Sequence, residues 1–248
     1  MDQFRDFADE RQRGVCIHCG KEIPKGQRSR DHVPSKCLMR KSEGPGNDAY
    51  PANIPVVWIC RECNQSFSCD EDYLRLFLHC VLAGSTNPGD HSHPAVRRAL
   101  ERHGQMRAQI EGSKTQVLAV GRDPLPVWIP DERRVKRVVL KNAKGHAFFE
   151  LGHPVWAKEK HVWAKPLVRM TQPERRVFFE VPSSDCPGWP EVGSRMMTRL
   201  VTGQDVRDAW IVVQEGVYRY RVEQTAGLFV KSILFEYLAT ETYWEDVA

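Results

Sequence analysis

The chain has 248 residues, 41% of them hydrophobic and 27% charged, which suits one large domain or two small ones with a buried core. Its net charge of +4 is a mild excess that permits a polyanionic partner without requiring one. Residues 1–14 are charged and lack the apolar segment of a signal peptide, and no run reaches the roughly 18 apolar residues of a membrane helix. We therefore expect a cytoplasmic protein with reduced thiols and no membrane association.

Two cysteine pairs of identical spacing lie near the N-terminus, Cys16-x2-Cys19 and Cys60-x2-Cys63. A CxxC turn presents two thiolates to one metal ion, and two such turns complete a tetrahedral zinc site. Reduced cysteine pairs favour a metal over a disulfide, so we predict a structural zinc ion on these four residues. The alternative is two unrelated pairs. We expect His18, inside the first pair, to be a bystander, because its neighbours already supply two ligands.

Between the pairs, Asp31 and His32 stand side by side in a segment that predicts a strand ended by Pro34. Neighbouring residues of a regular strand point to opposite faces, so both can serve one site only at a strand end or a bulge. Residues 54–59 predict a second strand, which passes into a helix at the second cysteine pair. Asn64 follows that pair and is either a metal ligand or a helix cap. Asp31 with His32 is either a catalytic pair or an ordinary surface pair.

An amphipathic helix is predicted next, with Ser68 or Asp70 as its cap and apolar residues at helical spacing from Tyr73 to Val81. The turn-forming residues 84–89 end it. Residues 94–110 predict a second, strongly basic helix, whose arginines form either a solvated face or a surface for nucleic acid.

After residue 112 the pattern changes to short apolar runs typical of strands, at 115–120 and 125–130. Residues 131–150 then predict a basic helix with one apolar face. Further strands are expected over 161–168, 175–181, 209–214, 217–224 and 228–237, with a hairpin turn at Gln214-Glu215-Gly216. We therefore expect an α+β fold: a small zinc-stapled module with trailing helices over 1–111, followed by a β-rich α+β domain over 112–248.

The pattern C-x2-C, D-H-x-P, N, C-x2-C-N over residues 16–75 resembles the HNH endonuclease family. The resemblance implies a ββα-metal unit, in which a hairpin and a helix hold a catalytic divalent cation and cysteine-bound zinc braces them. It also implies an endonuclease, a hydrolase of phosphodiester bonds whose partner is nucleic acid, with DNA expected first.

Carried over by position, the resemblance makes His32 the general base that activates water. Asp31 and Asn64 would hold the catalytic cation, and Asn53 would orient His32, with Asn47 competing for that role. A neutral imidazole accepts a proton near pH 7, and carboxylate and amide oxygens suit Mg²⁺ or Mn²⁺. The alternative is a zinc-stapled module that binds nucleic acid or protein without catalysis. The sequence defines neither the target nor the oligomeric state.

Overall fold

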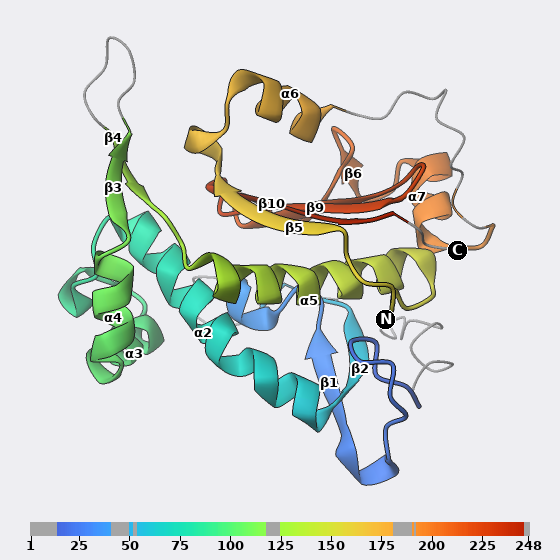
Figure 1. The fold of residues 1–248 in the computed structure, drawn as a ribbon, viewed down its shortest axis with the longest axis horizontal. Coiled ribbons are helices and arrows are strands. Elements are labelled where there is room, and N and C mark those ends of the chain that lie inside the picture. The colour runs from blue at the N-terminus through green and yellow to red at the C-terminus, as the bar shows by residue number, and fades with distance from the viewer. Residues whose placement is uncertain are drawn as a thin grey trace.

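The computed structural model describes residues 14–40, 50–51, 54–117, 125–180, 190 and 192–245. Asn53 and Asn47, the two candidates for orienting His32, lie outside the described residues. The described chain is a mixed α+β fold with a six-stranded antiparallel sheet (Figure 1). The predicted fold class is confirmed at that level.

Two short strands and a long helix form the N-terminal part. β1 (Arg28–His32) and β2 (Val56–Cys60) are antiparallel, and their register is continuous from Arg28 opposite Cys60 to His32 opposite Val56. α2 (Arg61–Ala83) starts directly after β2, as expected for the second cysteine pair. Two 3-10 turns flank β1: η1 (Lys25–Gln27) and η2 (Lys36–Leu38).

The predicted cap of α2 at Ser68 or Asp70 is wrong. Cys60 caps the helix, and its sulfur accepts a hydrogen bond from the backbone N–H of Cys63. The first turns of α2 carry mostly polar residues, so the apolar periodicity that marks a helix in the sequence appears only later. Gly84 ends the helix in the left-handed conformation, as predicted.

The basic helix expected over 94–110 is two helices. α3 (Pro94–Arg102) and α4 (Gly104–Glu111) are separated at His103, whose backbone leaves the helical region with φ −106° and ψ 61°. The 3-10 turn η3 (Pro88–Asp90) precedes them.

The next two predicted strands are confirmed where the structure describes them; residues 118–120 of the first lie outside the described residues. β3 (Lys114–Val117) pairs with β4 (Leu125–Trp128) in antiparallel register. Figure 1 shows these two strands projecting from the body above α3 and α4.

The helix predicted over 131–150 is α5 (Glu132–Leu151), and it is the centre of the fold. Figure 1 shows it between the sheet on one side and β1, β2 and α2 on the other. Asp131 caps its start, and Gly152 ends it with a positive φ. The predicted apolar face is buried. Polar side chains are buried along the same helix: Lys141, Asn142, His146 and Glu150.

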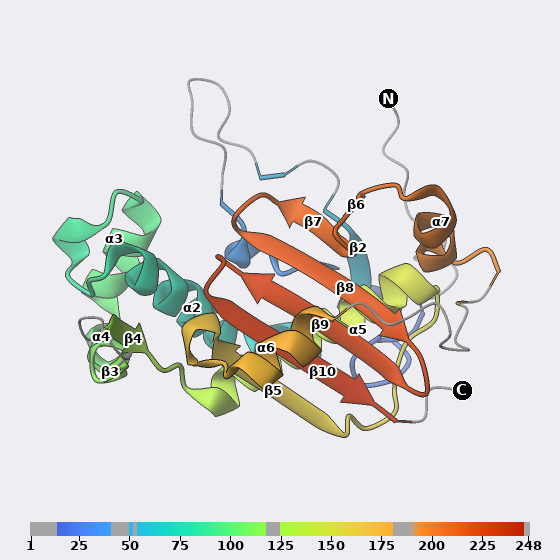
Figure 2. The same cartoon turned by 90° about the horizontal axis from the view of Figure 1, so that it is seen from above.

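The C-terminal part forms the six-stranded sheet in the order β5-β10-β9-β8-β7-β6 (Figure 2). The turn expected at Gln214-Glu215-Gly216 is confirmed, since it joins β7 to β8. The strands are β5 (His161–Pro166), β6 (Val206–Arg207), β7 (Trp210–Gln214), β8 (Tyr218–Gln224), β9 (Leu228–Leu234) and β10 (Leu238–Trp244). The helical segments are η4 (Leu167–Arg169), α6 (Gln172–Phe179) and α7 (Arg195–Thr202).

The strand expected over 175–181 is wrong, because most of that segment belongs to α6. Thr171 and Glu174 form a capping box at its start, with proline inside the first turn. This local signal outweighs the β-forming run of valine and phenylalanine. α6 lies over the face of the sheet opposite α5 (Figure 1).

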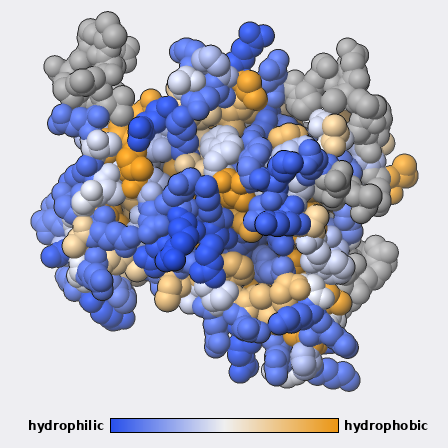
Figure 3. All heavy atoms as spheres, in the orientation of Figure 1, coloured by the Kyte–Doolittle hydropathy of each residue, from blue (hydrophilic) through white to orange (hydrophobic). Residues whose placement is uncertain are grey.

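One hydrophobic cluster connects α2, α3, α4, α5 and the sheet. A second, smaller cluster packs β2, the turn that begins at Cys16, and Val33, which follows β1, against Phe148 of α5. The first cluster contains residues on both sides of position 111, so the division into 1–111 and 112–248 stays a prediction. The face of the molecule in Figure 3 is mainly hydrophilic, with apolar side chains scattered among charged ones.

Candidate metal centre

The four predicted zinc ligands meet at one point. The Sγ atoms of Cys16, Cys19, Cys60 and Cys63 all lie within 4.8 Å of one another, and those of Cys19 and Cys60 are 3.9 Å apart. A tetrahedral zinc ion with Zn–S bonds of about 2.3 Å separates its sulfurs by roughly 3.8 Å. The cluster is therefore confirmed as a group that can hold a structural metal, and zinc as its occupant remains a prediction.

Two tight turns build this cluster. In the first, the backbone N–H of Cys16 donates to the Lys21 carbonyl, and that of Gly20 donates to the Cys16 carbonyl, both at 2.9 Å. Gly20 has φ +71°, which provides the chain reversal expected of the glycine after this pair. The second turn is the start of α2, where the N–H of Cys63 lies 3.4 Å from the sulfur of Cys60.

The surroundings of the cluster act on the charge of its thiols. Burial raises the pKa of the Cys16 and Cys63 thiols, so these two keep their protons until a metal displaces them. Lys144 of α5 donates to the backbone carbonyl of His18 at 3.4 Å and places a positive charge beside the sulfurs. That charge offsets part of the negative charge that a four-thiolate zinc site carries.

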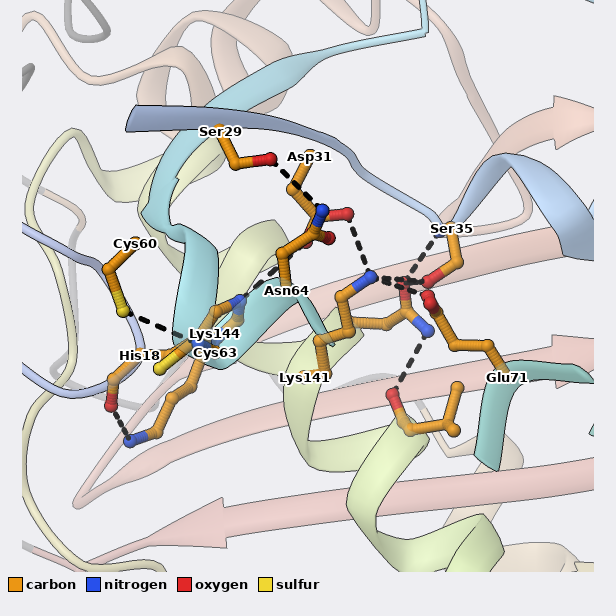
Figure 4. Close-up of polar contacts among 12 residues, drawn as sticks. His18, Ser29, Asp31, Ser35, Cys60, Cys63, Asn64, Glu71, Lys141 and Lys144 are labelled. Carbon is orange, nitrogen blue, oxygen red and sulfur yellow. Dashed lines mark hydrogen bonds and ion pairs between the residues drawn. The ribbon is translucent and has the colours of Figure 1, made fainter. Parts of the chain in front are cut away.

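Asp31 is buried between β1, α2 and α5, where it binds a lysine (Figure 4). The Nζ atom of Lys141 lies 2.7 Å from Asp31 Oδ1, 3.1 Å from Ser35 Oγ and 2.5 Å from Glu71 Oε1. The Lys141 side chain is only 2% exposed. Ser35 is fixed in turn by Asn142, whose amide oxygen accepts from its backbone N–H at 2.7 Å and its hydroxyl at 3.1 Å.

The ion pair keeps both of its main partners charged. Burial alone would lower the pKa of Lys141, but Asp31 and Glu71 raise it above its ordinary value. Burial alone would likewise raise the pKa of Asp31, but His18 and Lys141 hold it below its usual range. Asp31 is therefore an ionised carboxylate at neutral pH, as a metal ligand must be.

Asn64 lies next to Asp31. Its Nδ2 donates to Ser29 Oγ at 3.0 Å, and Ser29 is two residues before Asp31 on the same face of β1. Figure 4 shows the Asn64 side chain beside the Asp31 carboxylate. The alternative role of Asn64 as the helix cap does not apply, because Cys60 holds that position.

His32 faces the other way. The register with β2 is regular through His32 and Val56, so strand alternation directs His32 to the face opposite Asp31. It is the last residue of β1, which matches the expected strand end. Burial lowers the pKa of His32, so its imidazole is neutral at pH 7. The structure thus brings Asp31 and Asn64 together, whereas His32, the next residue after Asp31, points to the opposite face.

Gly145 of α5 allows the end of β1 to approach this closely. A Cβ atom at that position would lie 2.6 Å from Cγ2 of Val33 and 2.9 Å from its Cγ1, well inside van der Waals contact. A glycine in a helix interior usually weakens the helix, so its presence here has a packing reason. The missing side chain lets Val33 dock on α5 and carries the neighbouring His32 and Asp31 with it.

Four partners in this centre were not predicted from the sequence: Lys141, Glu71, Ser35 and Asn142. The helix over 131–150 was predicted to have one apolar face and basic residues elsewhere, with no buried lysine. One signal was available: Lys141 follows Val138 by three positions and therefore lies on the apolar side of α5. A lone lysine within an apolar stripe indicates a buried ion pair, although it does not identify the carboxylates.

Asp31 and Asn64 were predicted as ligands of a second, hard divalent cation, and each has an oxygen of the type that such a cation prefers. Lys141 holds Oδ1 of Asp31, and Oδ2 lies 3.6 Å from Nε2 of His18. Neither ring nitrogen of that buried histidine has a hydrogen-bond partner within the described part of the chain. A carboxylate and an amide beside an orphaned imidazole form a donor set that suits a cation.

The chain matches no family model, no curated protein and no solved structure. Among the helices of the described residues, none is long and apolar enough to cross a bilayer.

Proposed function

We propose that this chain is a metal-dependent HNH-type endonuclease that hydrolyses phosphodiester bonds of nucleic acid, with DNA as the first substrate to test. The observation that carries the proposal is the meeting of Asp31 and Asn64. β1 and α2 bring this carboxylate and amide to one face, beside a four-cysteine cluster. The proposal also rests on the order of the motifs along the chain, with Asp31-His32 between two cysteine pairs and Asn64 directly after the second.

In this proposal the zinc ion is structural, and it fixes the joint between β2 and α2 to the first cysteine turn. Asp31 and Asn64 would hold Mg²⁺ or Mn²⁺, which when bound neutralises the charge that develops on the phosphate and the leaving oxygen. Lys141 keeps Asp31 ionised and sets the direction of its carboxylate. His32, neutral at pH 7, keeps its predicted role of accepting the proton of the attacking water; because it lies on the face opposite Asp31, this role requires the water to sit at the end of β1, where both side chains are within reach. Asn53 keeps its predicted role of orienting that ring.

The basic surface that best suits a nucleic-acid partner is on α3. Its buried residues Val96 and Leu100 face the core, and the exposed side carries Arg97, Arg98 and Arg102. The basic residues of α5 are less available. Arg134 and Arg137 both bind the carboxylate of Asp70 on α2, at 3.0 Å and 2.5 Å.

A zinc-stapled module that binds nucleic acid without cleaving it is the second candidate. The burial of the centre favours it, because Asp31 is only 7% exposed and Lys141 of α5 covers one of its oxygens. A polymer phosphate reaches such a carboxylate only if the surrounding side chains move.

The experiment compares cleavage and binding in the same preparations. Supercoiled plasmid and single-stranded RNA are incubated with zinc-loaded wild type, His32→Ala and His103→Ala, each with Mg²⁺ or Mn²⁺. His103 is an exposed histidine between α3 and α4 and serves as the matched control. Nicking by wild type and His103→Ala, and its loss in His32→Ala with zinc and circular dichroism unchanged, is the expected result.

Absence of cleavage of both substrates by folded, zinc-loaded wild type would refute the nuclease proposal. If the same preparations then retard DNA on a gel or change its anisotropy, the second candidate is the correct one. If they neither cut nor bind, both candidates fail.

A further inference from the structure

His18 is the polar side chain that the candidate centre leaves unexplained. It lies inside the first cysteine pair, its side chain is 5% exposed, and within the described residues neither ring nitrogen makes a hydrogen bond, although Nε2 is at ion-pair distance from Asp31. A buried polar group without a hydrogen bond is rare and often marks a missing ligand, ion or water. The expectation that His18 is a bystander gives no reason for this arrangement.

The ring is directed at the carboxylate of Asp31. Nε2 of His18 lies 3.6 Å from Oδ2 of Asp31, too far for a good hydrogen bond. Two ligand atoms that are each about 2.1 Å from one cation are separated by roughly 3.0 Å at a right angle and by about 3.6 Å at 120°. The observed 3.6 Å is the distance of a loose ion pair, and it also leaves space for one cation to contact both atoms.

Asn64 adjoins the same space. The ring of His18 contacts that of Phe67 with centroids 5.1 Å apart, and Phe67 follows Asn64 by three positions on α2. Residues three apart on a helix share a face, and Asn64 is tied to β1 through Ser29 next to Asp31. Figure 4 shows His18, Asp31 and Asn64 grouped on the side of Asp31 away from Glu71.

The geometry points to His18 as a third ligand of the divalent cation, completing a site of one imidazole nitrogen from His18 and oxygens from Asp31 and Asn64. This inference rests on the proposed function, since it adds a ligand to the same cation. A nitrogen donor shifts the preference of the site from Mg²⁺ towards a first-row ion such as Mn²⁺. The ion lies at Oδ2 of Asp31, and the Lys141 ammonium keeps Oδ1.

The position of His18 in the chain links the two metals. It is held between Cys16 and Cys19, so the turn that closes on zinc also fixes the imidazole. The carbonyl of His18 is bound by Lys144 of α5, which restrains the backbone from the other side. The structural ion thereby orients a ligand of the reactive one.

The test measures Mn²⁺ binding by the zinc-loaded full chain, using the electron paramagnetic resonance signal of free Mn²⁺. The variants are His18→Ala, Asp31→Asn and, as a matched control, His103→Ala, with zinc content and circular dichroism recorded for each. Wild type and His103→Ala are expected to bind one Mn²⁺ with equal affinity. His18→Ala is expected to bind it at least about tenfold more weakly, and Asp31→Asn more weakly still.

A second measurement keeps the inference testable if His18→Ala loses zinc. Pulsed electron paramagnetic resonance of wild type with Mn²⁺ is expected to show coupling to an imidazole nitrogen, and that coupling is expected to vanish in His18→Gln. Wild type without this coupling, or without a bound Mn²⁺ at all, would overturn the inference. So would a folded, zinc-loaded His18→Ala that binds Mn²⁺ as tightly as wild type.

These outcomes separate the inference from the proposed function. Nitrogen-coupled Mn²⁺ in a protein that cuts no nucleic acid leaves the ligand set correct and the nuclease proposal wrong. If the protein cleaves nucleic acid but its bound Mn²⁺ shows no nitrogen coupling, the nuclease proposal is correct and the ligand set is wrong.

Discussion

The cysteine cluster and the Asp31 centre lie side by side, but their construction differs. The cluster takes all four sulfurs from two short turns between residues 16 and 63. Asp31 depends on groups far away in the chain: Lys141 is 110 positions later, and Ser35 is held by Asn142, 107 positions later. A local motif thus holds one centre, and the packing of α5 against β1 and α2 holds the other.

This difference determines what each centre needs. The cluster needs an ion, because four thiols held this close together, two of them buried, repel once they ionise. The Asp31 centre already contains its positive charge in Lys141, and it needs α5 to stay in place. The two can therefore be broken separately, one by removing metal and the other by substitutions on α5.

Loss of the zinc ligands should have the largest effect. Structural zinc contributes about 10–16 kcal/mol of apparent binding free energy at pH 7, and much of it is folding free energy in a small module. Cys60→Ser should lose stoichiometric zinc and the cooperative thermal transition of the N-terminal part, and a strong chelator should do the same to wild type.

Cys69→Ser is the matched control, because Cys69 is an exposed cysteine on α2 outside the cluster. It should keep its zinc and its melting temperature. A Cys60→Ser protein that melts like untreated wild type, or a wild type whose melting does not change with chelator, would show that the cluster is not a structural metal site.

Lys141→Met should have the next largest effect. The substitution removes the Lys141 ammonium and leaves the largely buried carboxylates of Asp31 and Glu71 without a positive partner. Removing one member of a buried ion pair costs about 3–5 kcal/mol of stability. Urea denaturation followed by circular dichroism measures the loss. Lys136→Met is the control: its pair with Glu132 is largely exposed, so the change should stay below about 0.5 kcal/mol. Equal urea midpoints for the two variants would contradict the assignment of Lys141.

Gly145→Ala should have the smallest effect, and its sign is informative. Alanine favours a helix over glycine by about 1 kcal/mol, but here its Cβ would collide with both methyl groups of Val33, and overpacking costs about 1–3 kcal/mol. We expect a net loss of about 1 kcal/mol in urea denaturation. Adding Val33→Ala should remove the clash in a double-mutant cycle. A Gly145→Ala protein more stable than wild type would show that β1 does not dock on α5 as described.

The cysteine cluster could be predicted from the sequence because its whole geometry is local. The spacing of Cys16 and Cys19, with Gly20 behind them, already describes a turn that binds metal. The strand-to-helix passage at Cys60 followed from an apolar run ending at a cysteine pair, and the structure has β2 and α2 there. Only the start of α2 was misplaced, since its first turns lack an apolar stripe.

The Asp31 centre could be predicted only in part. Asp31 and Asn64 were selected by their places in a motif, whereas the partners that keep Asp31 ionised and oriented come from α5. Their choice depends on how that helix lies across β1, which in turn depends on the contact between Gly145 and Val33. The hydrophobic pattern of a single sequence does not reveal that a glycine in one helix makes room for a residue of another element.

The long sequence distance between Asp31 and Lys141 also has a consequence for synthesis on the ribosome. The cysteine turns are complete once residue 63 has emerged, so zinc can close them early in translation. Asp31 and Glu71 then remain hydrated until α5 has been made and can supply Lys141. The nascent chain therefore passes through a stage in which its cysteine turns are complete and the Asp31 centre is still open to water.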